Sequence, residues 1–348
     1  VLEHLHYPAW RLIMNKKTKR TPSLNLATFR RSILEALSCN CDFETSVRRL
    51  RGRISNITPG TLYVRRTKSN VWFYERKQSS ETYLRKSENR IYELAQKEYM
   101  EKLIEVLQLR RKFDFDHEFF ASAFEEMIDL LETFEFGKLD ISRIVYSPKQ
   151  YAWFNSPRHR KLLHNSAYDV DDSRITSRGV HVRSKSEKAI ADALESYGVN
   201  YIYESKFVIN VQPFVDSLCV ELQKAGIPAS KKPYYYSNGV CYWSVPSCFD
   251  FMNLPGSLWH TYDARSGTVT IYPDFTIMLN DGSMFVWEHD GLIDQTAYRS
   301  NAGERLFAMN VCSSLSRENI LTSYEKDITD AKALQSLVMN YVLKRLWF

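Results

Sequence analysis

Two acidic residues occupy positions where a carboxylate is unusual and where it could hold a divalent metal ion. Asp274 follows Pro273 in a strand-like stretch, 272–278, that is otherwise mostly apolar, and Glu288 comes near the end of the next strand-like stretch. An ionised carboxylate on a buried strand is costly unless something pairs with it, and two carboxylates side by side also repel each other. A divalent cation relieves both penalties. The pattern therefore predicts a metal site at Asp274 and Glu288.

The segment between the two acids predicts that they lie close together. Residues 268–279 and 283–289 have the composition of two strands, and Asn280-Asp281-Gly282 between them is a turn signal of the hairpin kind. Strands joined by a tight hairpin are antiparallel neighbours. Asp274, near the start of one strand, and Glu288, near the end of the other, are then expected at the same edge of the sheet.

Glu187 is the third acidic candidate. It lies early in a predicted helix, 184–197, from which its carboxylate could reach the metal directly or through water. Mg²⁺ suits such a site, because proteins bind it through one or two carboxylates while waters and substrate phosphate oxygens complete the octahedron. Each acid taken alone has a simpler interpretation, as a residue near a turn, a salt-bridge partner or a helix N-terminal acid. The three together, in this order of elements, favour the metal site.

The C-terminal half alternates helix and strand in the order α-β-(insert)-β-β-α-β-α. After the helix at 184–197, which Gly198 ends, the predicted elements are a strand at 200–210, an insert at about 211–267 with a short helix at 214–225, the two hairpin strands, a helix at 294–312, a strand at 319–323 and a helix at 327–346. The aromatic residues beside Lys231 and Lys232 in the insert could stack on bases or form a small core of their own. Both interpretations stay open.

The N-terminal half is predicted to be mainly helical. A helix is expected from Ser23 onward, followed by a β-hairpin and two long helices; the hairpin strands are 61–65 and 71–75, and the helices are 80–111 and 117–134. Residues 138–180 read as an irregular connector. We therefore divide the chain into a basic N-terminal domain (1–137), this connector, and a C-terminal domain (181–348) that carries the insert.

Composition and charge narrow the range of molecules that this protein is expected to bind. The 348 residues carry a net charge of +6, but residues 1–80 contain 16 Lys and Arg against 5 Asp and Glu, a balance of +11 that leaves −5 for the rest. Such a basic block suits a polyanion such as DNA or RNA, although a solvated basic face would look the same. No apolar run is long enough for a membrane span, and no signal-peptide pattern is present. We expect a cytoplasmic protein without a membrane partner.

The C-terminal motifs resemble those of the PD-(D/E)XK (restriction-endonuclease-like) nuclease superfamily, in a bacterial and phage branch with a Glu-His-x-Gly signature. The matching pieces cover about half of the chain and are Arg183-Ser-Lys-Ser-Glu187, Tyr203-Glu204, Pro273-Asp274-Phe275, Trp287-Glu288-His289-Asp290-Gly291, Tyr298 and the helix that contains Arg305. The resemblance implies an α/β fold with an αβββαβ core, a mixed sheet flanked by helices. It also implies that Asp274 and Glu288 bind Mg²⁺ or Mn²⁺ directly, with Glu187 as the auxiliary acid.

One position departs from the family pattern. The family's lysine, two residues after the second acid, is Asp290 in this chain. A cation could come from elsewhere, Asp290 could itself help to bind a metal, or the site could be weakened. Lys185 and Arg305 are the candidate cations, and we rank Lys185 first, because the very high pKa of Arg makes it a poor proton shuttle. His289 is expected to face away from Glu288 and to serve a structural role.

These observations predict a metal-dependent nuclease that hydrolyses phosphodiester bonds in DNA, most simply an endonuclease, with Glu187, Asp274, Glu288 and Lys185 as catalytic residues. The alternative is a catalytically inactive protein of the same fold that binds nucleic acid or forms part of a complex. A transposase-like subunit that cleaves DNA ends would share the chemistry. A homodimer or a partner protein stays open.

Overall fold

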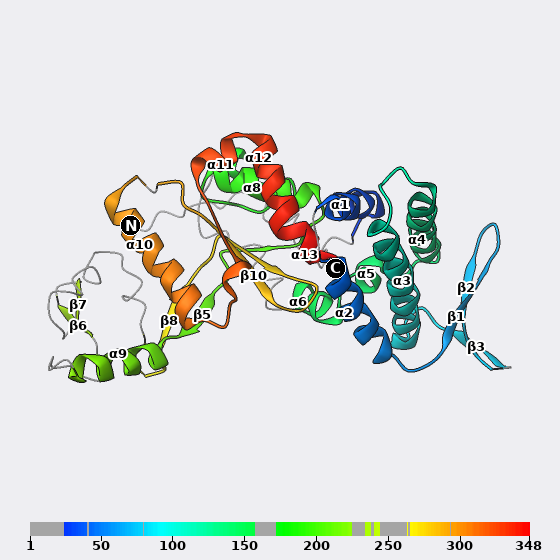
Figure 1. Ribbon diagram of the computed structural model, residues 1–348, viewed down its shortest axis with the longest axis horizontal. Coiled ribbons are helices and arrows are strands. Elements are labelled where there is room, and N and C mark those ends of the chain that lie inside the picture. The colour runs from blue at the N-terminus through cyan, green and yellow to red at the C-terminus, as the bar shows by residue number, and fades with distance from the viewer. Residues whose placement is uncertain are drawn as a thin grey trace, which may run out of the picture.

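The protein has a mixed α/β fold in a computed structural model (Figure 1). The structure describes residues 24–39, 42–78, 80–156, 172–224, 234–237, 240–243, 263, 265–292 and 294–348. Within these residues, no helix has the length and apolar composition needed to cross a membrane. The predicted α/β class is confirmed.

A group of helices forms the N-terminal half, as the sequence predicted. Its members are α1 (Leu26–Ser38), α2 (Phe43–Ser55), α3 (Asn89–Arg110), α4 (Glu118–Phe136), α5 (Ile141–Val145) and α6 (Pro148–Phe154). Asn25 caps α1 by accepting a hydrogen bond from the backbone N–H of Thr28, and Asp42 caps α2 in the same way. Ser23, from which this first helix was expected to start, lies outside the described residues. Helix α2 was not predicted, and α5 and α6 lie in what the sequence suggested was an irregular connector.

The predicted hairpin is part of a three-stranded antiparallel sheet. Strand β2 (Val71–Lys77) lies between β1 (Thr61–Arg66) and β3 (Ser80–Leu84). The prediction that a helix begins at Ser80 is therefore wrong, since residues 80–84 pair with β2 and α3 begins only at Asn89. Sheet pairing decides the conformation of this short segment, which carries too few residues for a helical stripe to be distinguished.

A four-stranded mixed sheet forms the centre of the C-terminal half, with the strand order β11-β10-β9-β4. Strand β10 (Met284–His289) runs antiparallel to β9 (Phe275–Met278) and parallel to β11 (Ile320–Ser323), and β9 is antiparallel to β4 (Ile202–Tyr203). The turn between β9 and β10 is the predicted one: Gly282 has a φ of +81°, a conformation that glycine adopts without steric cost.

Two predicted strands are each broken into two pieces that belong to different sheets. Residues 268–279 form β8 (Thr268–Ile271) and β9, and the break falls at the tripeptide that contains Pro273, which has no N–H to donate to a ladder. Residues 200–210 form β4 and β5 (Phe207–Asn210), separated at Glu204, whose φ is +47°. Strands β5 and β8 pair with each other in a separate two-stranded sheet.

The remaining C-terminal elements lie on both sides of β10 (Figure 1). They are α8 (Lys185–Ser196), α9 (Gln212–Lys224), the strand pair β6 (Tyr234–Ser237) and β7 (Val240–Trp243), α10 (Thr296–Phe307) with a π-helical turn at Ala308–Cys312, α11 (Glu325–Thr329), α12 (Ala331–Leu337), a π-helical turn at Val338–Leu343 and α13 (Lys344–Leu346). The strand pair was not predicted, and the closing helix is segmented rather than continuous. Lys231, Lys232, Phe249, Phe251 and Trp259 of the insert lie outside the described residues.

One hydrophobic core connects the N-terminal helices with the C-terminal sheet. The chain end contributes to it directly, because the buried Trp347 ring packs edge-on against Phe29 at 5.1 Å and its Nε1–H donates to Ser32 Oγ at 2.8 Å. Arg49 of α2 donates a hydrogen bond to the backbone carbonyl of Phe348. The last residues of the chain therefore hold α1 and α2 against the C-terminal half.

Candidate metal centre

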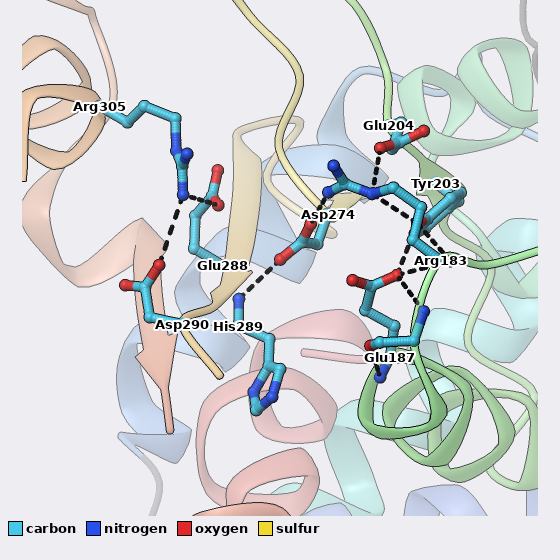
Figure 2. Close-up of polar contacts among 10 residues, drawn as sticks. Arg183, Glu187, Tyr203, Glu204, Asp274, Glu288, His289, Asp290 and Arg305 are labelled. Carbon is cyan, nitrogen blue, oxygen red and sulfur yellow. Dashed lines mark hydrogen bonds and ion pairs between the residues drawn. The ribbon is translucent and has the colours of Figure 1, made fainter. Parts of the chain in front are cut away.

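Asp274 and Glu288 lie together at one edge of the mixed sheet, as predicted (Figure 2). Trp287 pairs with Phe275 in the β9–β10 ladder, which places the next residues, Glu288 and Asp274, opposite each other. The backbone N–H of His289 donates to Asp274 Oδ2 at 2.7 Å, across the same edge. Both acidic residues are 4% exposed. Two neighbouring carboxylates are therefore almost completely removed from water.

This burial changes the ionisation of the pair. Burial, together with the negative charge of Glu187, raises the pKa of Asp274 from 3.8 to about 7, although the His289 N–H and Arg183 act in the opposite direction. The pKa of Glu288 is raised well above its usual value by burial and by the neighbouring charge of Asp274. The pair thus favours holding a proton, or another positive charge, near neutral pH.

Glu187 approaches this site from the first turn of α8. Ser184 and Glu187 form a capping box, in which the Ser184 Oγ accepts from the Glu187 N–H and the Glu187 carboxylate accepts from the Ser184 N–H. The same carboxylate oxygen accepts from the Tyr203 hydroxyl at 2.6 Å and from the Arg183 N–H at 2.9 Å. Glu187 thus has the structural role that its position at a helix N-terminus suggested, and its charge also acts on Asp274.

Arg183 joins two of the buried acids. Its guanidinium lies 2.8 Å from Glu204 Oε1 and 3.2 Å from Asp274 Oδ1 (Figure 2). The Arg183 side chain is 46% exposed, whereas those of Glu204 and Asp274 are 10% and 6% exposed. The arginine therefore covers the carboxylates from the solvent side. The sequence motif Tyr203-Glu204 did not predict this role of Glu204, because its burial next to Arg183 depends on the break between β4 and β5.

Arg305 reaches the other side of the site from α10. Its Nη2 lies 3.6 Å from Glu288 Oε2 and 3.4 Å from Asp290 Oδ1. The position at which the family pattern has lysine thus holds a buried acid that shares an arginine with Glu288. By contrast, Lys185 is exposed in the first turn of α8, and none of the ion pairs in the described part of the chain joins it to Asp274 or Glu288. The contacts favour Arg305, which we ranked second.

His289 lies on the opposite face of the sheet from Glu288, as predicted. Its ring is buried, with Nδ1 3.1 Å from Ser323 Oγ and Nε2 3.3 Å from Glu325 Oε2. It lines a pocket of about 360 Å³ at the start of α8, together with Arg183, Ser184, Ser186, Glu187, Gly291, Leu292 and Glu325. Glu187 and Arg183 therefore adjoin both the acidic pair and this pocket.

The acidic residues fit a cation in charge and burial, but their side chains are not arranged as a finished metal site. Glu288 Oε1 is buried without a hydrogen-bond partner in the part of the chain that the structure describes, so one carboxylate oxygen is available to a ligand. Across the same described ranges, however, no three Asp, Glu, His or Cys side chains converge in a way that could hold a metal ion. Arg183 and Arg305 contact the carboxylates instead. Metal binding would require Arg183 to release Asp274.

Comparison of the chain with known protein families, with curated proteins and with solved structures gives no match.

Proposed function

We propose that this chain is a metal-dependent nuclease that hydrolyses phosphodiester bonds in DNA, with Asp274 and Glu288 as metal ligands and Glu187 as the auxiliary acid. The observation that carries the proposal is the buried, unpartnered Oε1 of Glu288 beside Asp274, whose pKa is raised to about 7. A buried pair of this kind is costly for folding, and such costs are concentrated at functional sites.

The order of elements also supports the proposal. When β5, α9, β6, β7 and β8 are set aside, helix α8, the strands β4, β9 and β10, helix α10 and strand β11 come in the order α-β-β-β-α-β, the order that the family resemblance implies. Within that order, Glu187 lies on the first helix, and Asp274 and Glu288 lie on the second and third strands or directly before them. This placement of the three motif acids supports the proposal.

Mg²⁺ or Mn²⁺ bound there would supply positive charge against the negative charge that develops on the phosphate and would favour ionisation of an attacking water. The protein's own groups would orient the site. The Asp274 carboxylate is fixed by the His289 N–H, and that of Glu187 is fixed by the Tyr203 hydroxyl. The half-exposed guanidinium of Arg183 can turn from Asp274 towards a phosphate, which arginine binds in a bidentate manner.

The second candidate is a catalytically inactive protein of this fold that binds nucleic acid. Three observations favour it: Asp290 stands in place of the family's lysine, Arg183 and Arg305 already provide cations to the carboxylates, and no three ligands converge in the described ranges. In this case the arginines would replace the metal permanently.

Metal binding and cleavage together distinguish the two candidates. We expect Mn²⁺ to bind the purified protein, measured by calorimetry in the absence of nucleic acid, and plasmid DNA to be cut when Mn²⁺ is present. Glu288→Gln and Asp274→Asn should lose both properties. Glu318→Gln, which neutralises an acid whose side chain is 77% exposed and lies near Arg345, is the matched control and should keep both. Equal behaviour of wild type and Glu288→Gln in both assays would reject the nuclease. Cleavage of RNA in place of DNA would correct the substrate.

A further inference from the structure

The face of the β1-β2-β3 sheet that points away from the helices carries a row of three tyrosines. Tyr63, Tyr74 and Tyr83 are direct register partners on the three strands, so their side chains lie next to one another on one face. The ring centroids are 6.4 Å apart between the first two and 5.7 Å apart between the last two. Tyr83 is 49% exposed. The row therefore crosses the whole width of the sheet at the surface.

Basic side chains lie on the same face. The guanidinium of Arg76 stands over the Tyr63 ring at 4.1 Å, and that of Arg65 stands over the Tyr74 ring at 5.4 Å. Trp72, the register partner of Arg65, adds a fourth aromatic side chain. Glu81 is the acidic residue of this face, and it is paired with Arg76. We call these aromatic and basic residues (Tyr63, Arg65, Trp72, Tyr74, Arg76 and Tyr83) the tyrosine face.

The opposite face of the sheet packs against the hydrophobic core, and the tyrosine face takes no part in that packing. Leu62, Val71, Phe73 and Leu84 are buried there and belong to the main hydrophobic core. Glu75 points to the same side, where it is buried and hydrogen-bonded to Arg90. The sheet thus has one face committed to the core, while the other exposes aromatic rings that the core does not use.

The charge of this region indicates what could cover the tyrosine face. Residues 61–84 contain five Lys and Arg and two Asp and Glu, and both acids are already paired with arginine. Basic side chains next to aromatic rings are the combination with which proteins hold unpaired nucleotides, the cations meeting the phosphates and the rings stacking on the bases. In a duplex the faces of the bases are already stacked on one another, so aromatic rings on a flat sheet have no base face to stack on.

We propose that the tyrosine face binds single-stranded nucleic acid. The proposal rests on the proposed function only in making nucleic acid the ligand. The sheet projects from the helical half of the molecule, at the far end from α9 and α10, and β10, which carries Glu288, lies between these ends (Figure 1). Asp274, directly before β9, lies beside Glu288. A nucleic-acid strand that contacts both the tyrosine face and the acidic pair must therefore extend along the helical half. The sheet binds an unpaired segment that is remote from the bond to be cut.

Fluorescence anisotropy of a labelled 15-nucleotide oligothymidylate tests this proposal, with the full chain in EDTA so that metal-dependent cleavage plays no part. Tyr83→Ala and Tyr74→Leu should each weaken binding about tenfold, the order expected for losing one stacked base, and Tyr74→Phe should restore most of it. Arg65→Ala should make the salt dependence shallower by about 0.7 in the slope of log K against log salt. Tyr341→Ala and Arg317→Ala are the matched controls and should bind as wild type does; Tyr341 is 46% exposed, and Arg317 is an exposed arginine of the C-terminal half.

The fluorescence of Trp72 gives a second readout, which would not change on oligonucleotide binding if the tyrosine face had only a structural role. Stacking should quench part of the tryptophan emission when the oligonucleotide binds, and Trp72→Phe should remove that part. Binding that is unchanged in both tyrosine variants, or a duplex of the same length that binds more tightly than the single strand, would overturn the proposal. Because Glu288→Gln leaves the tyrosine face intact, it should lose cleavage and keep this binding. The cleavage and binding assays therefore distinguish a failure of the nuclease proposal from a failure of the tyrosine-face proposal.

Discussion

The metal-free protein should become less stable as the pH rises from about 4 to 7, which is opposite to the usual behaviour of carboxylates paired in a fold. The folded protein binds a proton at Asp274 with a pKa of about 7, whereas the unfolded chain releases it near 3.8. Between these values the folded state holds more protons than the unfolded state, so the free energy of unfolding falls with pH. Below 3.8 the stabilising effect is complete, and it is lost as the pH passes 7.

The size of the effect follows from this difference. About three pH units, at about 1.4 kcal/mol per unit, correspond to about 4 kcal/mol over the full range. About 2 to 3 kcal/mol of this falls between pH 5 and pH 7, where proteins are easily handled. Because Asp274 and Glu288 titrate as a pair, the loss belongs to both groups rather than to Asp274 alone.

Glu288→Gln is the perturbation that isolates this cost. It keeps the shape of the side chain, removes the buried charge next to Asp274, and leaves Arg305 its contact with Asp290. We expect the variant to be about 2 kcal/mol more stable than wild type at pH 8 and equal to it at pH 5, with a shallower pH dependence. Urea denaturation in EDTA at pH 5, 6, 7 and 8 measures the difference in stability at pH 8, the difference at pH 5 and the slope of stability with pH.

Glu75→Gln is the control with the opposite sign. Glu75 is also buried, but its pKa is lowered, mainly by the hydrogen bond from Arg90. Neutralising it should therefore cost about 1 to 3 kcal/mol at pH 8. The reasoning fails if wild-type stability is constant or rises between pH 5 and pH 7, or if the difference in stability between Glu288→Gln and wild type is the same at pH 8 as at pH 5.

Three further outcomes are expected. Mn²⁺ at about 100 times its dissociation constant should raise the free energy of unfolding of the wild type by about 2.7 kcal/mol, and it should leave Glu288→Gln unchanged; equal shifts in both proteins would place the ion elsewhere. Tyr203→Phe removes the hydroxyl that donates to Glu187 and should lower the free energy of unfolding in urea by about 1 to 3 kcal/mol. Tyr272 is 53% exposed, so Tyr272→Phe should have no measurable effect. The same loss of stability in both variants would argue against the Glu187 contact. Trp347→Phe leaves the Ser32 hydroxyl without its donor and should lower thermal stability by about 1 to 3 kcal/mol, while Trp72→Phe on the tyrosine face is neutral; the reverse order would contradict the assigned role of the chain end.

The local part of the site could be predicted from the sequence. Mostly apolar, strand-like stretches on each side of the turn signal Asn280-Asp281-Gly282 predicted the hairpin, and antiparallel pairing then placed Asp274 and Glu288 at one edge, with His289 facing the other way. The helix that carries Glu187 could be predicted in the same way, because Gly198, which ends it, directly follows the helical segment. These features depend on interactions between residues a few positions apart.

The partners of the acids were decided by tertiary structure alone. Arg183 lies 91 positions from Asp274, and Arg305 reaches Glu288 from a different element, α10. The break at Pro273 and the pairing of residues 80–84 with β2 likewise depend on which strands are available as neighbours. Periodicity carries no information about such contacts, since ion pairs and strand pairing join segments whose separation in the chain is set by the fold. The sequence identified acids that needed positive charge, and the tertiary structure determined that two arginines provide it.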